Sequence, residues 1–212
     1  KDLQLKVLKI LDNQVSLLKH KNVNKAAAIV IDNDSGDILA YHGTNDFFGE
    51  TSGSQLDSVL LRRQPGSAVK PFTYLFAFEN GFNTSSLLPD IPISFNVGAG
   101  VYKPRNYNEK FTGPRILADS LANSLNIPAL FLVDILGVDK LFAFYNKLGF
   151  KLSHDPDYYG VGITLGNAEV SLMQLVRAYT LFSSGGNIRN LRFLLNEKKS
   201  NLELVSDSQK SW

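Results

Sequence analysis

The stretch Gln64-Pro65-Gly66-Ser67-Ala68-Val69-Lys70-Pro71-Phe72 decides how the rest of the chain is interpreted. Pro65 and Gly66 predict a turn, and the residues after them predict a helix with Ser67 in its first turn. Lys70 follows Ser67 by three residues, so the two side chains lie on one face of that helix. An uncharged lysine can take the proton of a serine hydroxyl and make it a nucleophile. The N–H groups left free at a helix start can hold an anion, such as the oxyanion of a tetrahedral intermediate.

The alternative for Ser67 is an ordinary helix cap, because a Ser-x-x-Lys sequence often arises by chance. The helix that follows is strongly apolar, which favours the catalytic interpretation and indicates that Lys70 points into a buried place. These apolar residues are Phe72, Tyr74, Leu75, Phe76 and Phe78. Burial lowers the pKa of a lysine, so we expect Lys70 to be neutral when it acts as a base.

Composition limits the class of protein. The 212 residues are 44% hydrophobic and 20% charged, which is typical of one globular domain with a real core. A net charge of +2 is too small to indicate a nucleic-acid partner. The chain has no cysteine, and its three histidines have no spacing typical of metal ligands, so neither a metal nor another cofactor is predicted. No Gly-x-Ser-x-Gly elbow is present for a Ser-His-Asp triad.

The order of predicted elements indicates an α+β fold. Apolar residues spaced three or four apart predict an amphipathic helix in residues 1–21. Ala26–Asp32 and Asp37–His42 predict a β-hairpin, and its first strand is apolar on both faces, as in a central strand. Several helices follow, and strand-like sequence returns from Ile188 onward. This order predicts an antiparallel sheet with helices packed on it.

A second polar group, Ser124-Leu125-Asn126, lies between two predicted helices. Pro114 suits the first turn of a helix ending near Ala122, and Pro128 suits the start of the next. In extended backbone, residues two apart point the same way, so Ser124 and Asn126 would face one cleft. The alternative is that both residues cap the following helix.

Residues 102–108, Tyr-Lys-Pro-Arg-Asn-Tyr-Asn, are dense in polar and aromatic side chains. They fit a packed surface loop and the wall of a substrate groove equally well.

Taken together, these stretches resemble the transpeptidase domain of class A penicillin-binding proteins, from about residue 25 onward. Residues 65–72 look like the family's first motif, Ser-x-x-Lys, and residues 124–126 look like its second, Ser-x-Asn. The segment 102–113 and the Gly-x-x-x-Gly stretch at 162–166 are similar to parts of the same domain. The sequences of residues 59–72 and 100–128 most closely resemble those of the penicillin-binding protein 1C subfamily.

This resemblance implies an acyl-transfer enzyme acting on peptidoglycan stem peptides that end in D-Ala-D-Ala. Ser67 would be the nucleophile that forms the acyl-enzyme, and Lys70 its general base. Ser124 would relay the proton to the leaving amine. Asn126 would bind the substrate amide and help to hold Lys70. β-Lactam antibiotics would acylate the same serine, and no metal is implied.

The resemblance also implies a serine β-lactamase/transpeptidase-like fold, an α/β sandwich with helices on both faces of an antiparallel sheet. Residues 1–24 would be a linker helix, and residues 25–212 a transpeptidase domain truncated before the third motif, Lys-Thr/Ser-Gly, and its C-terminal strands. The nearest strings, 199–201 and 42–44, do not match that motif. The parent protein would carry an upstream glycosyltransferase domain and a membrane anchor, and would act on the periplasmic face of the inner membrane.

Two other hypotheses stay open. A serine β-lactamase or a DD-carboxypeptidase shares Ser-x-x-Lys chemistry, but the segment 102–113 argues against both. A catalytically incomplete fragment that serves as a binding or interaction module would account for the missing third motif.

Overall fold

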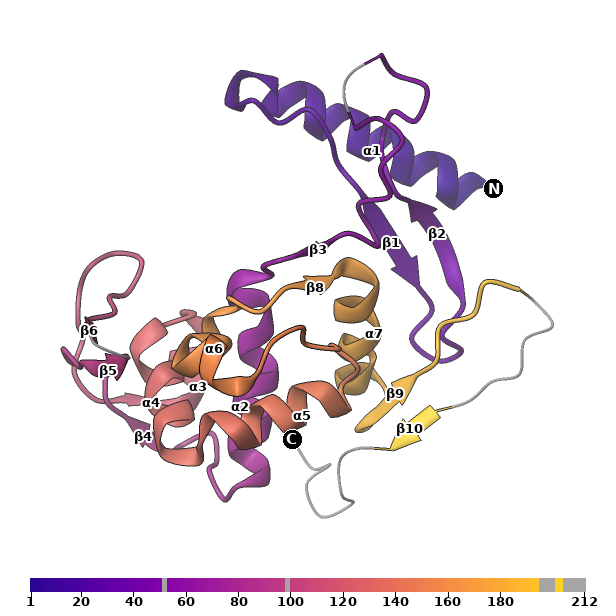
Figure 1. Cartoon of the computed structure of the whole chain (residues 1–212). Helices are drawn as coiled ribbons and strands as arrows, with labels where there is room; N and C mark the ends of the chain where they lie inside the picture. Colours follow the sequence, from indigo (N-terminus) through magenta and orange to yellow (C-terminus); the bar gives the residue numbers. More distant parts are fainter. Residues whose placement is uncertain (51–52, 98–99, 195–200, 204–212) are drawn as a thin grey trace. The chain divides into compact units, whose positions relative to one another are not determined.

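The computed structural model describes residues 1–50, 53–97, 100–194 and 201–203 (Figure 1). The chain divides into two compact units, one made of Lys1–Arg63 with Val170–Trp212 and the other of Gln64–Glu169. Every site residue predicted from the sequence falls in the second unit. Residues 199 and 200, part of one string compared with the third motif, lie outside the described residues.

The first unit combines a helix, a β-hairpin and the helix α7. Its elements are α1 (Asp2–Leu18), η1 (Lys19–Lys21), β1 (Ala28–Ile31), β2 (Ile38–His42), β3 (Arg62–Arg63), β8 (Val170–Ser171), α7 (Leu172–Ser183), β9 (Asn187–Arg189) and β10 (Asn201–Glu203). Helix α1 contacts β2, and α7 contacts β1. Gln4 fixes α1 to β2, since its amide donates to Tyr41 O at 2.8 Å and accepts from Tyr41 N at 2.9 Å.

The predicted N-terminal helix and hairpin are both confirmed. Strands β1 and β2 pair antiparallel, with Ala28 opposite His42, and Asp32 Oδ1 accepts from Ser35 N at 2.7 Å within the turn. The expectation of a central strand is not met among the described residues, where β1 pairs with β2 alone. An apolar run predicts that both faces of a strand are covered by other side chains. Neighbouring strands join instead at the two edges, through backbone hydrogen bonds, so the apolar run does not predict how many strands pair with this one.

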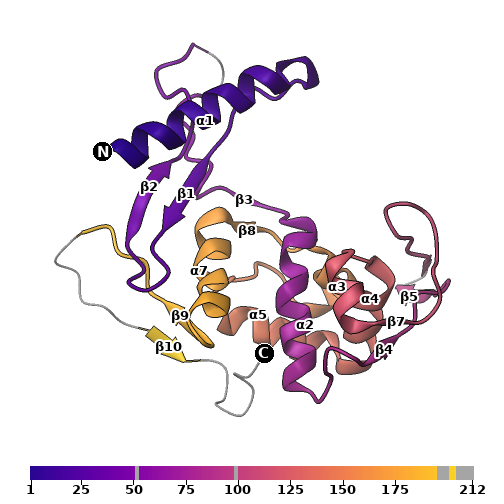
Figure 2. The same cartoon turned by 180° about the vertical axis from the view of Figure 1, so that it is seen from behind.

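The second unit is mainly helical and is built around α2. Its elements are η2 (Gly66–Val69), α2 (Lys70–Glu79), β4 (Leu87–Leu88), β5 (Phe95–Val97), β6 (Gly100–Tyr102), β7 (Arg115–Ile116), α3 (Leu117–Ala122), α4 (Asn126–Leu136), α5 (Val138–Lys147), α6 (Pro156–Tyr159) and η3 (Gly160–Leu165). Helix α2 contacts α3, α4 and α5 (Figures 1 and 2). Residues 72–77 of α2 are all buried, as expected of a helix that is apolar around its circumference.

Two helix starts differ from the sequence-based prediction. Ser67 lies in the 3₁₀ turn η2, and the α-helix begins only at Lys70. Pro114 does not open a helix, because Arg115 and Ile116 form β7 and pair with β4 before α3 begins at Leu117. A short strand pairing of this kind depends on a distant segment and leaves no local sequence signal.

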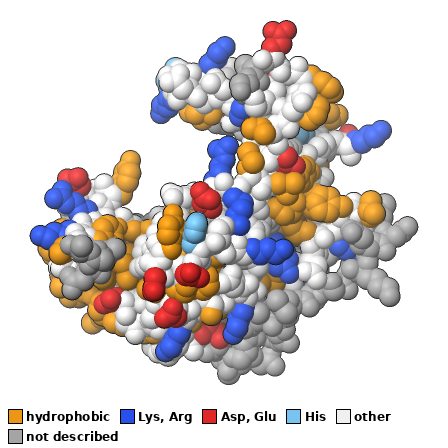
Figure 3. Space-filling view, viewed as in Figure 1, with side chains coloured by type: hydrophobic (Ala, Val, Ile, Leu, Met, Phe, Trp, Pro, Cys, Tyr) orange, Lys and Arg blue, Asp and Glu red, His pale blue; other side chains and the backbone are white. Residues whose placement is uncertain are grey.

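The predicted α+β class is confirmed. In the described part of the chain, every strand pair is antiparallel. None of the described helices is both long and apolar enough to cross a lipid bilayer. Figure 3 shows exposed apolar side chains on α1 and over the β1–β2 hairpin, where Leu17 and Leu39 are 66% and 47% exposed.

Candidate active site

Lys70, the first residue of α2, is the buried centre of the site. Its side chain is 1% exposed, as the apolar helix predicts. Its Nζ donates to Ser124 O at 2.5 Å, to Ser124 Oγ at 3.2 Å and to Asn126 Oδ1 at 2.7 Å. The fold therefore brings together residues from the two predicted motifs, more than fifty positions apart in the chain.

Ser67 lies one turn before Lys70, and its side chain is exposed. Its hydroxyl makes no hydrogen bond within the part of the chain that the structure describes, so Ser67 and Lys70 are not joined directly. The backbone before it turns at Gly66, which has a φ of +59°. Ser67 is thus presented outward at the start of a buried helix, with its hydroxyl available to a ligand.

Ser124 owes its orientation to the end of α3. The N–H groups of Ser124 and Leu125 donate to Leu121 O and Ser120 O, which is the Schellman arrangement that closes a helix. Ser124 occupies the left-handed position, with a φ of +50°, where glycine is the usual residue. The expectation of extended backbone was wrong at Ser124, yet its side chain and that of Asn126 both reach Lys70.

Neither Ser124 nor Asn126 caps α4, so that alternative was wrong. The N-cap residue is Leu125, and no side-chain cap bond comes from it. Asn106 supplies the acceptor instead, because its Oδ1 accepts from Asn126 N at 2.8 Å. The side chain of Asn126 spans two partners, accepting from Lys70 and donating from Nδ2 to Arg105 O at 2.8 Å.

Burial lowers the pKa of Lys70 from its ordinary value of 10.5 to about 8. No acidic side chain among the described residues pairs with it, so burial is not offset by an opposite charge. With a pKa of about 8, roughly a tenth of Lys70 is neutral at pH 7 and roughly nine tenths at pH 9. The neutral amine expected from the sequence is therefore accessible near neutral pH, although it is the minor form there.

Gly166, in the predicted Gly-x-x-x-Gly stretch, lies against the turn that carries Ser67. A methyl group at Gly166 would overlap Gly66 O and would lie 2.5 Å from Gly66 N. Gly166 also has a φ of +77°. This position therefore requires glycine both for its backbone conformation and for its close approach to Gly66.

We expect Gly166→Ala to lower the free energy of unfolding by about 3 kcal/mol or more, because it combines backbone strain with a backbone clash. Gly113→Ala is the matched control, since Gly113 has nearly the same φ, +78°, but has no atom within 4 Å of an added methyl group. Urea unfolding of the two variants separates the backbone strain, which both variants share, from the clash with Gly66, which only Gly166→Ala has. Equal destabilisation would show that the contact with Gly66 is unimportant.

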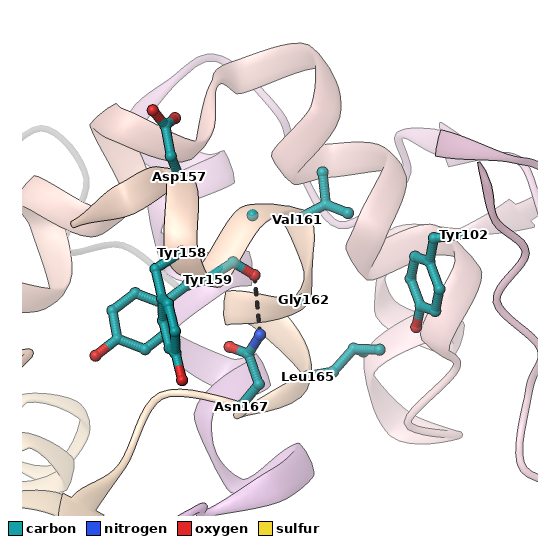
Figure 4. Close-up of a pocket in the computed structure, with 9 residues that line it drawn as sticks. Tyr102, Asp157, Tyr158, Tyr159, Val161, Gly162, Leu165 and Asn167 are labelled. Atoms are coloured by element: carbon teal, nitrogen blue, oxygen red, sulfur yellow. Dashed lines mark hydrogen bonds between the residues drawn. The ribbon is translucent and has the colours of Figure 1, made fainter. Parts of the chain in front are cut away.

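A pocket of about 420 Å³ opens beside η3 (Figure 4). Figure 4 shows Tyr102, from β6, on one side of the pocket and Tyr158 and Tyr159, from α6, on the other. Asn167 donates to Tyr159 O at 2.9 Å. Tyr102 thus lines a pocket, as a groove wall would, while Asn106 of the same segment is buried against α4.

The sequence did not single out the buried pair Asp90 and Asn106, which lie behind Asn126. In the sequence, Asn106 stands out only as a member of the polar and aromatic stretch 102–108, and Asp90 does not stand out at all. A buried carboxylate bonded to a distant amide has no characteristic local spacing. Among the described residues, no group of His, Asp and Glu side chains is arranged to hold a metal ion.

Comparison with known proteins gives one consistent result. The family model for the penicillin binding protein transpeptidase domain matches residues 26–211. Penicillin-binding protein 1B of Buchnera aphidicola is 31% identical over 87% of this chain and 25% of its own length. Penicillin-binding protein 1C of Escherichia coli is 31% identical over 78% of the chain and 21% of its own length.

The structural comparison agrees. The crystal structure of penicillin-binding protein 1A from Haemophilus influenzae superposes with a TM-score of 0.70 at 29% identity, covering 79% of this chain and 25% of that one. The chain therefore spans about a quarter of the length of these relatives.

Proposed function

Because this chain belongs to the penicillin-binding protein transpeptidase family, we propose that it acts as a serine-type D-Ala-D-Ala transpeptidase that cross-links peptidoglycan stem peptides. The observation that carries the proposal is the state of Lys70. It is a buried lysine with a lowered pKa, held by Ser124 and Asn126 one turn after an exposed serine. This combination provides a base beside a nucleophile that a substrate can reach.

In the proposed reaction, Ser67 Oγ attacks the carbonyl carbon between the two D-alanines, and neutral Lys70 takes the hydroxyl proton. The C–N bond then breaks, and the proton passes from Lys70 through Ser124 Oγ to the leaving D-alanine amine. The 3.2 Å contact between Lys70 Nζ and Ser124 Oγ suits this relay. A lysine ammonium donates to the serine, whereas a neutral amine can accept from it. An amine of a second stem peptide then attacks the carbonyl carbon of the acyl-enzyme. The C–O bond to Ser67 breaks, and a proton of the amine returns through Lys70 to Ser67 Oγ.

Electrostatic stabilisation of the intermediate comes in part from the backbone. The N–H of Ser67 would donate to the oxyanion, and the Asn126 amide would bind the substrate backbone. The Lys-Thr/Ser-Gly motif, which would bind the substrate carboxylate beside the second oxyanion donor, is not in this sequence. Losing one oxyanion donor lowers a rate by about 10²–10³. We therefore propose that residues 25–212 form the transpeptidase portion, that residues 1–24 lead into it, and that the third motif completes it.

The proposal also covers the ligands, the cellular location and the parent protein. Stem peptides ending in D-Ala-D-Ala and β-lactams would be the ligands, and the site of action would be the periplasmic face of the inner membrane. The parent protein would also carry a peptidoglycan glycosyltransferase. The family description, which names penicillin binding and transpeptidation, supports the ligand classes.

The acylation rate is expected to rise about tenfold between pH 7 and pH 9, with an inflection near pH 8, because only neutral Lys70 can accept the Ser67 proton. The sign follows from the lowered pKa, since raising the pH increases the neutral fraction. Stopped-flow measurement with a fluorescent penicillin gives the profile. A flat profile across this range would exclude Lys70 as the titrating base.

The direct test is intact-mass analysis after incubation with benzylpenicillin. We expect one covalent adduct per chain, mapped by peptide digestion to the fragment that contains Ser67. Slow release of the acyl group supports the transpeptidase, whereas rapid release indicates a β-lactamase. A folded chain that forms no adduct favours the binding-module hypothesis. The same experiment on a chain extended through the third motif shows whether acylation requires that motif.

A further inference from the structure

Two buried polar side chains, Asp90 and Asn106, lie behind the second motif. They are 0% and 4% exposed. Asn106 Nδ2 donates to Asp90 Oδ1 at 2.6 Å and to Lys110 O at 2.9 Å. The second carboxylate oxygen of Asp90 accepts from the backbone N–H and the hydroxyl of Thr112, at 2.8 and 2.6 Å. Both side chains are therefore fully held by hydrogen bonds.

The other end of Asn106 meets the start of α4. Its Oδ1 accepts from Asn126 N at 2.8 Å and from Ile127 N at 3.4 Å, so it does the work of a helix cap from a distant segment. The orientation of this amide is fixed, because the partners of Nδ2 can only accept and the partners of Oδ1 can only donate. If the amide were reversed, its NH₂ group would face the N–H groups of Asn126 and Ile127, and its oxygen would face the oxygens of Asp90 and Lys110.

Asn126 is consequently held from two adjacent residues of one segment. Its backbone N–H donates to Asn106, and its side-chain Nδ2 donates to Arg105 O. These two bonds leave Asn126 Oδ1 directed at Lys70 Nζ, 2.7 Å away. Asn106 makes no described hydrogen bond to Ser67, Lys70 or Ser124, so any influence on the chemistry passes through Asn126.

We propose that Asn106, oriented by the buried Asp90 carboxylate, is a positioning residue that sets Asn126 against Lys70. The part of this inference that concerns acylation rests on the proposed function. The physical coupling between Asn106 and Lys70 does not depend on it. Without Asn106, the start of α4 loses its acceptor, and Asn126 Oδ1 loses its defined place beside the lysine.

The first measurement reads Lys70 itself. In a sample carrying ¹³C in lysine side chains, the Lys70 ε-carbon is followed by NMR across pH 6–11, with assignment by Lys70→Met. We expect the pKa of Lys70 to fall below its parent value in Asn106→Ala, because the ammonium loses an acceptor. The described polar contacts of Lys70 come only from Ser124 and Asn126. An unchanged pKa in the folded variant overturns the proposal.

Ser120→Ala is the matched control. Ser120 is also fully buried in this unit, and its hydroxyl donates to Ile116 O at 3.0 Å, but it has no side-chain bond to Asn126 or Lys70. Ser120→Ala loses one hydrogen bond where Asn106→Ala loses four, so a smaller loss of stability is expected, with the Lys70 pKa left at the parent value. A shift of the same size in Ser120→Ala would show that general loosening, not positioning, moves Lys70.

A reciprocal exchange covers the case in which Asn106→Ala does not fold. Asn106→Asp alone places two carboxylates against each other. Asp90→Asn alone turns an NH₂ group toward a donor, either that of Asn106 or those of Thr112. The double variant Asp90→Asn/Asn106→Asp restores a donor between the residues and keeps an acceptor for Asn126 N. It loses the bond to Lys110 O, because a carboxylate cannot donate, so the rescue is expected to be partial. We expect it to bring the Lys70 pKa back toward the parent value, and failure of rescue in a folded double variant counts against the proposal.

The second measurement reads acylation by benzylpenicillin. At pH 9, where Lys70 is mainly neutral in both chains, Asn106→Ala is expected to lower the acylation rate constant by roughly 10- to 100-fold, while the fraction of chains that finally acylate stays unchanged. A purely structural defect would lower that fraction and leave the rate constant of the remaining chains unaltered. If the parent chain forms no adduct, the proposed function fails by that result, and the NMR measurement still decides whether Asn106 positions Asn126.

Discussion

Ser67→Ala is expected to abolish the covalent benzylpenicillin adduct completely. The nucleophilic oxygen is removed, and loss of such a serine in a serine hydrolase lowers turnover by about 10⁶-fold. The fold should be unaffected, because Ser67 is exposed and its hydroxyl has no hydrogen bond in the described part of the chain. The change in unfolding free energy should stay within about 0.5 kcal/mol. Intact mass and urea unfolding together check both statements.

The matched control is Ser85→Ala, an exposed serine in the same unit. This variant should retain the full adduct at the parent rate. An adduct that persists in Ser67→Ala would place the nucleophile elsewhere, and peptide mapping would identify the residue.

Lys70→Met is expected to lower the acylation rate constant by about 10³-fold or more, because no other described group is placed to take the Ser67 proton. Its effect on stability is the sum of opposing changes. Removing the lysine relieves a desolvation penalty of about 3 kcal/mol at pH 7, from a pKa lowered from 10.5 to about 8. It also leaves the oxygen acceptors of Ser124 and Asn126 without their donor, at about 1–3 kcal/mol each.

The pH dependence of stability isolates the lysine. Since the pKa of Lys70 is lower in the folded chain, the unfolded chain binds more protons between pH 8 and pH 10.5, and the parent gains stability as the pH rises through that window. Lys70→Met should lack this gain, whereas Lys140→Met, at an exposed position on α5, should keep it. Urea unfolding at pH 7.5 and pH 10 makes the comparison. Tyr41 and Tyr74, whose pKa values are raised by burial, lower the stability of every variant alike at high pH, so the test is the difference between the parent and Lys70→Met. A difference that stays constant from pH 7.5 to pH 10 would contradict a buried Lys70.

Much of the site could be predicted from sequence because its chemistry is encoded locally. The spacing of Ser67 and Lys70 places them on one short helical stretch, and the apolar residues after them predict the burial of Lys70 that the structure shows. The hairpin at residues 28–42 and the helix at its N-terminal side follow from patterns only a few residues long.

Predictions that relied on unseen partners were less accurate. The strand pair β4–β7 displaced the predicted helix start at Pro114, and a Schellman turn rather than extended backbone orients Ser124. The Schellman bonds at Ser124 are local but fall on a serine, where glycine is the usual signal, whereas β7 was decided by hydrogen-bond partners in β4, outside the local sequence. Local propensity cannot report such partners.

The sequence by itself singled out Ser67, Lys70 and the second polar motif, and it indicated the family to which the chain belongs. Only the tertiary structure decided that Lys70 bonds to Ser124 and Asn126, and that Asp90 and Asn106 hold Asn126 in place. The reason is physical. A buried polar group must find a partner wherever the fold supplies one, and that partner can lie many residues away without leaving a trace in the local spacing.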